Sequence, residues 1–370
     1  MVAEVRNNPG ITRAAVAQRL GIGSGVATEV TARLREARLV TEVEAASSGR
    51  GRPSAALRAH PEGPLVLVAE VRQEGWRVAV AALDGALTPV ADGRNPADPQ
   101  PAQVLAQLTR ATRRAAREFG PRIRATSVSV PGVVEGTVLR QASGLGWEDV
   151  DLTELGAGVV GGPLLVGNDA TLAGVAEVRA GAAVGAGTAL HVQVEESPGG
   201  ALVVDGRPVV GATGAAGEFG HMPFGDRRVR CACGARGCWG TAVGARALAA
   251  ALGESGPVDP RALARRVSAG MGEVVTAQAA LLGAGLAALV NALDPEVVTI
   301  GGFAIAVRAA APEAFAEAYD GGLMRYRRAA PPPVRDSLLG DDGALRGAAA
   351  VGLDVVTAPE ALAAWAERWG

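Results

Sequence analysis

The feature that most constrains the fold of this chain is a succession of strand hairpins and helices that occurs twice. The first round holds the apolar, strand-length runs PLVLVAEV, WRVAVAALDG and TSVSVPGVVEG, with a helix expected over residues 101–119. It closes with GPLLVGNDATLAGVAEVRAG, which predicts a strand, a turn and a helix. The second round holds the strands TALHVQVEES, GGALVVDGRPV and VVTIGG, a long helix ending near Leu293 and a final helix around 345–356. Such repetition favours an α/β body of two similar lobes.

Charge divides the chain into a basic head and an acidic body. Residues 1–60 contain nine Arg against five acidic residues, whereas the other 310 residues contain 27 Arg against 33 acidic residues. The whole chain has 370 residues, a formal net charge of −2 and 48% apolar residues, which suits two to three domains with sizeable cores. The asymmetry indicates nucleic-acid contact by the head alone.

The head carries the pattern of two short helices joined by a glycine turn. Thr12 can cap the first helix, and Gly21 ends it. A second helix is expected from about Ser24 to Ala37, with a buried stripe of Val26, Val30 and Leu34. This is helix-turn-helix geometry, in which the second helix enters the major groove of DNA.

The segment after these helices resembles the wing of a winged helix-turn-helix. TEVEAA predicts a strand, and GRGRPS places arginines at a tip that can reach a narrow minor groove. A helical hairpin of no special use and a flexible basic linker are the alternatives. Gly23, Gly25 and Glu29 weaken the case, and the short stretch before Thr12 leads us to expect a start codon upstream. The candidate DNA-binding residues are Ser24, Thr28, Thr31, Arg35, Arg50 and Arg52.

A cluster of cysteines with an upstream histidine predicts a metal site. His221, Cys231, Cys233 and Cys238 have the spacing H-x9-C-x-C-x4-C, and they include all three cysteines of the chain. Thiolates with one imidazole are ligands that tetrahedral Zn²⁺ prefers, and Gly234 and Gly237 allow the loop to fold around the ion. Four protein ligands leave no position for water, so we expect a structural zinc. Three buried free thiols beside an unrelated histidine are the alternative.

The chain shows no export signal, and we expect it to be cytoplasmic with no membrane partner. Its first ten residues, MVAEVRNNPG, lack a charged segment followed by an apolar one. The uncharged stretch 274–293 is long enough to span a bilayer. Its alanines, glycines and polar residues instead predict a buried helix.

Three segments of the body, GNDATLAGVAE, GAAGEFGH and CACGARGCW, resemble the ROK family of repressors, open reading frames and sugar kinases in order, spacing and identity. The head is similar to the DNA-binding half of the family's xylose-repressor and N-acetylglucosamine-repressor branch. This resemblance covers almost the entire chain. It implies an actin-like, ribonuclease H-like sugar-kinase body of two lobes, with ligand between them, in dimers or tetramers. We therefore expect a winged helix-turn-helix over 1–60, a first lobe over 64–180 and a second over 181–370, whose C-terminal helix can return to the first lobe.

The resemblance also implies a sugar site. Asp169 matches the catalytic base of the kinases, which takes the proton from the sugar hydroxyl, and Asn168 matches a residue that binds neighbouring hydroxyls. By itself, an Asn-Asp pair after a strand is simply a turn. His221 would serve zinc and sugar through its two ring nitrogens. The candidate sugar-binding residues are Gly132, Asn168, Asp169, Glu218 and His221.

The sequence departs from the kinase pattern where phosphates should bind. The family's first phosphate loop, Asp-x-Gly-Gly-Thr, falls on residues 70–74, which read EVRQE. The second, Gly-Thr-Gly-x-Gly, falls on residues 195–199, which read EESPG, although Gly301 and Gly302 match the adenosine-side turn. Because carboxylates repel a triphosphate, we expect neither ATP binding nor an enzyme. Gly240 also stands where the kinases carry a sugar-binding Glu.

These observations predict a DNA-binding transcriptional regulator, a repressor of carbohydrate-related genes with an inactive, sugar-sensing body. A homodimer or homotetramer would offer paired recognition helices to an inverted repeat. The alternatives are an ATP-dependent sugar kinase of the ROK family and a ligand-independent DNA-binding protein whose body is a scaffold. The two phosphate loops argue against the kinase, and Gly240 slightly favours the scaffold.

Overall fold

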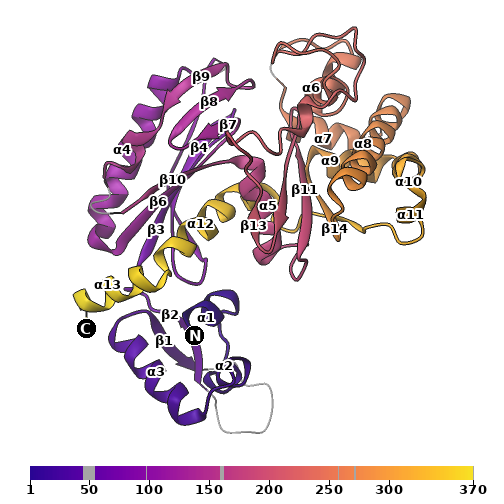
Figure 1. Cartoon of the computed structure of the whole chain (residues 1–370). Helices are drawn as coiled ribbons and strands as arrows, with labels where there is room; N and C mark the ends of the chain where they lie inside the picture. Colours follow the sequence, from indigo (N-terminus) through magenta and orange to yellow (C-terminus); the bar gives the residue numbers. More distant parts are fainter. Residues whose placement is uncertain (45–54, 97, 159–161, 257, 271, 370) are drawn as a thin grey trace.

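The chain folds into a small head and two larger lobes (Figure 1). The computed structural model describes residues 1–44, 55–96, 98–158, 162–256, 258–270 and 272–369. The predicted DNA contacts Arg50 and Arg52 lie outside the described residues.

In the head, residues 1–44 and 55–60 form three helices and a two-stranded antiparallel sheet. Thr12 caps the second helix by accepting a hydrogen bond from the amide of Ala15 at 3.2 Å, and Gly21 ends it with a φ of 64°. Both features agree with the sequence prediction. The elements are α1 (Val2–Asn7), α2 (Arg13–Leu20), α3 (Ser24–Glu36), β1 (Val40–Glu44) and β2 (Ala55–Ala59).

The face that α3 buries differs from the predicted stripe. Val26 is 53% exposed, whereas Ala27 and Thr31 are each 1% exposed. The Thr31 hydroxyl donates to the carbonyl of Ala27 at 2.7 Å and lies 3.5 Å from the Met1 sulfur. The inference that Thr31 faces DNA is therefore wrong.

The first lobe is a five-stranded mixed sheet with the order β10-β6-β3-β4-β5. Its central strand is buried on both sides: Leu67 faces α4, and Val66 and Val68 face α12 (Gly343–Val356). A separate antiparallel sheet, β7-β8-β9, adjoins it. The bounds are β3 (Leu65–Val71), β4 (Gly75–Ala81), β5 (Leu87–Arg94), α4 (Pro101–Phe119), β6 (Ile123–Val130), β7 (Val133–Glu135), β8 (Val138–Ala142), β9 (Trp147–Asp151) and β10 (Leu164–Asn168), with short 3-10 turns at Gly120–Arg122 and Thr153–Gly156.

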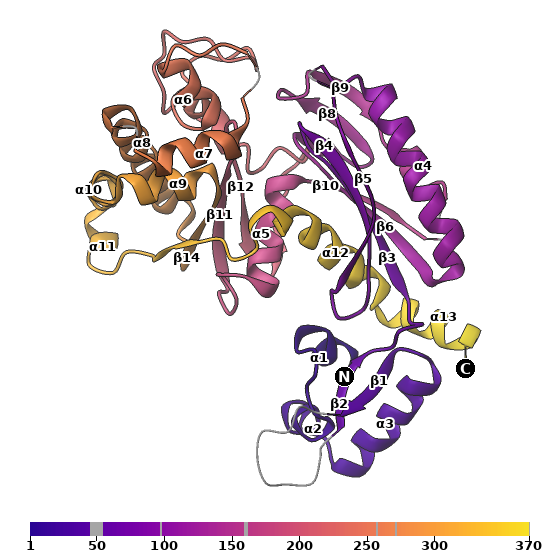
Figure 2. The same ribbon diagram turned by 180° about the vertical axis from the view of Figure 1, so that it is seen from behind.

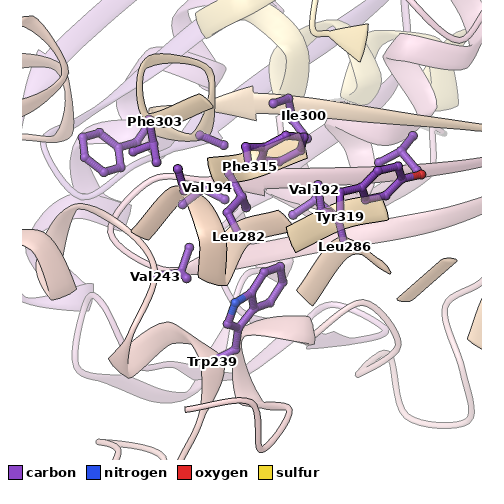
Figure 3. Packing of buried hydrophobic residues seen from close by; sticks show 14 of the residues in the cluster. Val192, Val194, Trp239, Val243, Leu282, Leu286, Ile300, Phe303, Phe315 and Tyr319 are labelled. Carbon is purple, nitrogen blue, oxygen red and sulfur yellow. The ribbon is translucent and has the colours of Figure 1, made fainter. Parts of the chain in front are cut away.

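The second lobe has the same plan, with the sheet order β13-β12-β11-β14-β15. Its core lies between this sheet and a layer of helices (Figure 3). The prediction of an α/β body with two similar lobes is confirmed. The bounds are β11 (Thr188–Val194), β12 (Pro198–Val204), β13 (Arg207–Pro208), α6 (Ala245–Ala251), α7 (Pro260–Ser268), α8 (Gly272–Leu293), β14 (Val297–Gly302), α9 (Phe303–Ala310), α10 (Pro312–Gly322), α11 (Arg325–Arg328) and β15 (Val334–Asp336), with 3-10 turns at Phe219–His221, Trp239–Thr241 and Gly340–Asp342.

Helix α8 is the one unbroken helix of the described residues that is long and apolar enough to cross a membrane. In this fold Leu282 and Leu286 of α8 are fully buried in the core of the second lobe. Helices α12 and α13 pass the same length test only as a pair bent by 73°. The long apolar run thus forms a core helix of the second lobe.

Two helices cross between the lobes. α5 (Asp169–Ala180) follows β10 of the first lobe and packs on β11 and β12 of the second, while α12 (Gly343–Val356) follows β15 of the second lobe and packs on β3 and β6 of the first. α13 (Pro359–Trp369) continues from α12 to the head (Figure 2). There the buried indole of Trp365 donates to the carbonyl of Ala37 at 2.7 Å, so the C-terminal helix joins body and head.

Candidate functional site

The histidine and three cysteines of the predicted metal site lie together. Their ligand atoms all fall within 4.8 Å of one another. Nδ1 of His221 is 3.8 Å from Sγ of Cys231, and the sulfurs of Cys233 and Cys238 are 3.7 Å apart. Ligands about 2.3 Å from a tetrahedral ion would be about 3.8 Å from each other. The donor set and its spacing therefore fit a four-coordinate metal ion.

The loop that carries these ligands packs on the core of the second lobe, and its most buried anchor is an aromatic side chain. Trp239, next to Cys238, is fully buried, and its indole donates to the carbonyl of Leu281 at 3.2 Å (Figure 3). Gly234 and Gly237 have φ values of 95° and 74°, as their predicted role in the loop requires. Much of the loop itself is exposed, so an ion would hold together a segment that has little core of its own.

Two of the predicted sugar-binding residues are joined directly. Asn168 is the N-cap of α5: its Oδ1 accepts from the amide of Thr171 at 2.9 Å, and its Nδ2 donates to the carbonyl of Gly132 at 3.0 Å. Gly132 has a φ of 114°, and a Cβ there would overlap the carbonyl of Gln141. The carboxyl ends of β6 and β10 thus bring these residues to one place, where α/β folds place ligands.

Asp169, the first residue of α5, has an unusual carboxyl group. Burial raises its pKa from 3.8 to about 7, the hydrogen bond from the amide of Ala170 opposes this shift, and the carboxylates of Glu218, Glu70 and Glu195 add to it. A carboxyl that titrates near neutral pH can take or hold a proton in cells. Its position suits contact with a hydroxyl group of a ligand.

Glu218 and His221 connect the candidate sugar site to the metal site. Nε2 of His221 lies 3.8 Å from a carboxylate oxygen of Glu218, while its Nδ1 faces Cys231. Burial raises the pKa of Glu218, and His221 opposes this shift. Nδ1 of His221 therefore faces the cysteine cluster and Nε2 faces Glu218.

The first predicted phosphate loop is a tight hairpin turn held by ion pairs. Glu70, with a side chain 3% exposed, contacts Arg77 at 2.6 Å and Arg72 at 3.0 Å. Arg77 also reaches Asp342 at 2.8 Å, and Arg72 donates to the carbonyl of Asp341. The guanidinium groups that lie nearest this turn are already engaged by carboxylates and a carbonyl.

The second lobe contributes to the same set of charges. Arg261, at the start of α7, lies 3.0 Å from Asp341 and 3.6 Å from Glu74, which belongs to the turn of the first lobe. We call Glu70, Arg72, Glu74, Arg77, Arg261, Asp341 and Asp342 the interlobe ion-pair network. It links β3, β4, α7 and the segment before α12.

One side chain of β11 and one of the second predicted phosphate loop lie over the glycine pair at the end of β14. A Cβ at Gly301 would overlap the amide oxygen of Gln193, and one at Gly302 would overlap the carboxylate of Glu195. These two side chains are joined by a hydrogen bond of 2.8 Å. Burial raises the pKa of Glu195 to about 7; Gln193 opposes this shift and Asp341 adds to it.

A serine occupies the space next to Gly240. A Cβ on Gly240 would collide with the hydroxyl of Ser197, which belongs to the second predicted phosphate loop. The two departures from the kinase pattern are thus in contact in the fold. A glutamate at position 240 would require Ser197 to move.

The predicted DNA-binding residues of α3 divide between its two faces. Ser24, Thr28 and Arg35 are exposed, whereas Thr31 is buried. Thr28 donates to the carbonyl of Ser24 at 2.9 Å, and Arg35 pairs with Glu42 of β1 at 3.3 Å. The structure therefore leaves three of the four candidates on α3 accessible.

Two features of the body were not predicted from the sequence: the interlobe ion-pair network and the buried carboxylate of Glu177. Glu177 accepts from the hydroxyl of Ser337 at 2.6 Å and from the amide of Ala182 at 2.7 Å. A signal did exist for one pair: Glu70 and Arg77 are charged residues in otherwise apolar strands, and they are direct partners in the β3-β4 register. Opposite charges at paired positions predict a cross-strand contact.

The model of the ROK family matches residues 74–354. A xylose repressor homologue of Caldicellulosiruptor sp. is 33% identical over 195 residues, which cover 47% of this chain and 49% of that protein. A glucokinase of Streptomyces coelicolor is 25% identical over 252 residues, covering 62% of this chain and 79% of that protein. The chain thus spans about half the length of the xylose repressor homologue and 60% of a second glucokinase, from Halalkalibacterium halodurans.

Solved structures share the fold of the body and, in one case, of the whole chain. A ROK family transcriptional regulator described as a homologue of the E. coli MLC protein superposes with a TM-score of 0.75 at 19% identity, covering 99% of this chain and 97% of that one. The ROK hexokinase of Thermus thermophilus has a TM-score of 0.60 at 32% identity, covering 77% and 96%. The body is therefore of the actin-like sugar-kinase type, and the likeness to the regulator extends through the head.

Proposed function

The chain belongs to the ROK family, and from that premise we propose that it is a DNA-binding transcriptional repressor of carbohydrate-related genes whose body senses a sugar. The observation that carries the proposal is the head. Its second and third helices form a helix-turn-helix, and α3 exposes Ser24, Thr28 and Arg35 while its other face packs on the head. A homodimer would offer two such helices to the half-sites of an inverted repeat.

Two arginines of the head are paired with a carboxylate that a DNA phosphate could replace. Arg35, with a side chain 54% exposed, shares Glu42 with Arg13. Exposed ion pairs of this kind contribute little to stability, so a DNA phosphate can replace the carboxylate at small cost. Arg50 and Arg52 would extend the contact from the wing into the minor groove.

The body is proposed to bind sugar without transferring phosphate. Gln193 and Glu195 lie over the glycine pair where an adenosine would pack, and the turn at residues 70–74 is engaged in ion pairs. A triphosphate would meet carboxylates rather than backbone N–H groups. The sugar itself would contact Gly132, Asn168, Asp169, Glu218 and His221.

We further propose that the metal centre holds a structural zinc ion. Three thiolates and an imidazole would fill its four positions, which leaves no site for a reactive water. When bound, the ion would supply a fixed charge and a rigid loop beside Glu218. His221 would then be held in one orientation, with Nε2 facing the sugar site.

One observation favours the kinase alternative. Asp169 has a pKa of about 7, which suits a general base at neutral pH, and glucokinases are among the relatives. The interlobe ion-pair network argues against it. The ligand-independent scaffold is favoured only by Gly240, which removes one carboxylate from the sugar site.

The test is selection of genomic DNA fragments by the purified full-length protein at about 150 mM salt, with and without glucose, xylose and other sugars. We expect a shared inverted repeat near carbohydrate genes and release by one sugar. Binding that no sugar alters would support the scaffold. ATP turnover with a sugar, abolished by Asp169→Asn, together with no enriched site, would establish the kinase instead.

Head variants sharpen this test. Arg35→Ala should weaken binding to the selected site about tenfold, within the range for loss of one base or phosphate contact. Arg117→Ala removes an exposed arginine from α4 of the body and serves as the matched control. Equal affinities for the two variants would contradict the placement of α3 on DNA.

A further inference from the structure

The body is attached to the head through a carboxylate that two arginines share. Asp354 of α12 accepts from Arg6 of the head at 2.6 Å through Oδ1 and from Arg179 of α5 at 2.9 Å through Oδ2. Three elements from distant parts of the sequence therefore meet at one side chain. The contact joins the head to both helices that cross between the lobes.

Arg6 is held firmly on α12. Its guanidinium also donates to the carbonyl of Ala350 and to the hydroxyl of Thr357, each at 3.3 Å, and its side chain is only 10% exposed. Val2 of the same short helix packs in a core with Leu353. A shift of α12 must therefore move α1 or break these contacts.

Arg179 lies at the opposite end of α5 from the candidate sugar site. Asp169 is the first residue of this helix, and ten residues further on Arg179 is about 15 Å away along the axis. Arg179 also donates to the carbonyl of Gly206 at 3.4 Å, which connects it to the hairpin of β12 and β13. One rigid helix thus spans from the sugar site to Asp354.

The two crossing helices are in backbone contact. A Cβ on Gly347 of α12 would overlap the carbonyl of Leu172 of α5, and one on Gly343 would lie 3.4 Å from the Cβ of Ala173. Interfaces this close shift as units rather than deform. Movement at the start of α5 is therefore passed to α12.

We propose that Asp354 is the positioning residue that couples the sugar site to the DNA-binding head, through Arg179 on one side and Arg6 on the other. The role in regulation rests on the proposed function, but the mechanical coupling does not. When ligand moves α5, the ion pair between Arg179 and Asp354 is altered. Asp354 then shifts Arg6, and with it the orientation of α1. Coupling of 5- to 150-fold is typical for such linked sites.

The experiment measures amide hydrogen exchange in the full-length protein without DNA or sugar. The proteins are wild type, Arg6→Ala, Arg179→Ala and the double variant. Arg6→Ala should raise exchange in residues 169–180 at least threefold, and this increase should disappear when Arg179 is already absent. Helix α8 in the second lobe reports global opening and should be unchanged in every variant.

Arg19→Ala is the matched control, because it removes another ion pair of α1, with Glu4 at 3.3 Å, without contacting the body. It should leave α5 unaffected. A rise in the exchange of α8 would reveal that Arg6→Ala folds poorly. In that case Arg6→Lys and Asp354→Asn, which are smaller changes, take its place in the experiment. An unchanged α5 in Arg6→Ala, or the same increase with and without Arg179, would overturn the proposal. Failure of the proposed function would instead appear only in the DNA selection.

Discussion

The loop with the candidate metal ligands and the two predicted phosphate loops lie near Asp169 and Glu218, yet they depart from the kinase pattern to very different degrees. The loop at residues 221–238 keeps four ligand atoms within 4.8 Å. The turns at residues 70–74 and 195–199 carry charged side chains that pair with one another and with neighbouring elements. The difference is the one that the proposed function requires: a body that would order a ligand site without transferring phosphate.

The largest expected effect tests the metal side of this comparison. Cys238→Ser should reduce bound zinc from about one per chain to near zero and lower the Tm more than any other substitution here, because a structural zinc supplies much of the folding energy of its loop. Metal analysis and calorimetry measure both. Arg228→Ala, which removes an exposed ion pair with Asp226 in the same loop, should leave zinc in place. Cys238→Ser protein with full zinc content would show that the ligand set is wrong.

The next effect tests the first phosphate turn. Arg77→Ala should lower the free energy of unfolding by about 3 kcal/mol, because Glu70 is buried and loses its closer partner. Arg140→Ala is the control: its partners Glu135 and Asp149 are exposed, so its loss should lower the free energy of unfolding far less. Denaturant unfolding gives both values. Equal costs for the two would mean that the network does not organise the turn.

A smaller effect concerns pH and the sugar site between these regions. The pKa of Asp169 is raised from 3.8 to about 7 in the folded protein. Its contribution to stability is therefore complete below about pH 4 and is lost as the pH rises through 7. An asparagine side chain cannot ionise, so Asp169→Asn should remove this loss. Between about pH 4 and 7 the free energy of unfolding of the variant should rise relative to wild type by about 2 kcal/mol, after allowance for solvent exposure. Parallel pH profiles of Tm would refute the assignment.

The smallest effect concerns the contact between the two departures from the kinase pattern. Gly240→Ala should destabilise the protein by about 1 kcal/mol, because the new Cβ meets the hydroxyl of Ser197, which can rotate away only in part. In a Ser197→Ala background the cost should fall, because the nearest remaining atom, the Cβ of residue 197, lies 3.2 Å away. A cost that is the same in both backgrounds would show that the two positions are independent.

Local patterns were enough to predict several features of this protein. The candidate metal ligands lie within 18 residues, so their spacing alone brings them together once the glycines allow the loop to turn. The N-cap at Thr12 and the turn at Gly21 depend on neighbours a few residues away. The two rounds of strands and helices follow from apolar periodicity, which does not depend on distant contacts.

The phase of α3 could not be predicted in this way. Of the predicted stripe, Val30 and Leu34 are half-buried and Leu34 packs against two core clusters, whereas Val26 is exposed and the buried positions are Ala27 and Thr31. Which face is covered depends on where α1 and α2 pack, and small residues allow a closer approach than large ones. Amphipathic pattern is a weak guide in a helix whose hydrophobic residues lie on more than one face.

The sequence by itself determined the two-lobed α/β plan, the Cys-His cluster that could hold a metal ion and the charged residues of the turns at 70–74 and 195–199, because each depends on the identity or spacing of nearby residues. Only the tertiary structure decided that Arg261 meets Glu74, that Ser197 lies against Gly240 and that Arg6 and Arg179 share Asp354. Arg6 and Asp354 are 348 residues apart. Contacts between charges so distant arise from the packing of whole helices, which no local pattern encodes.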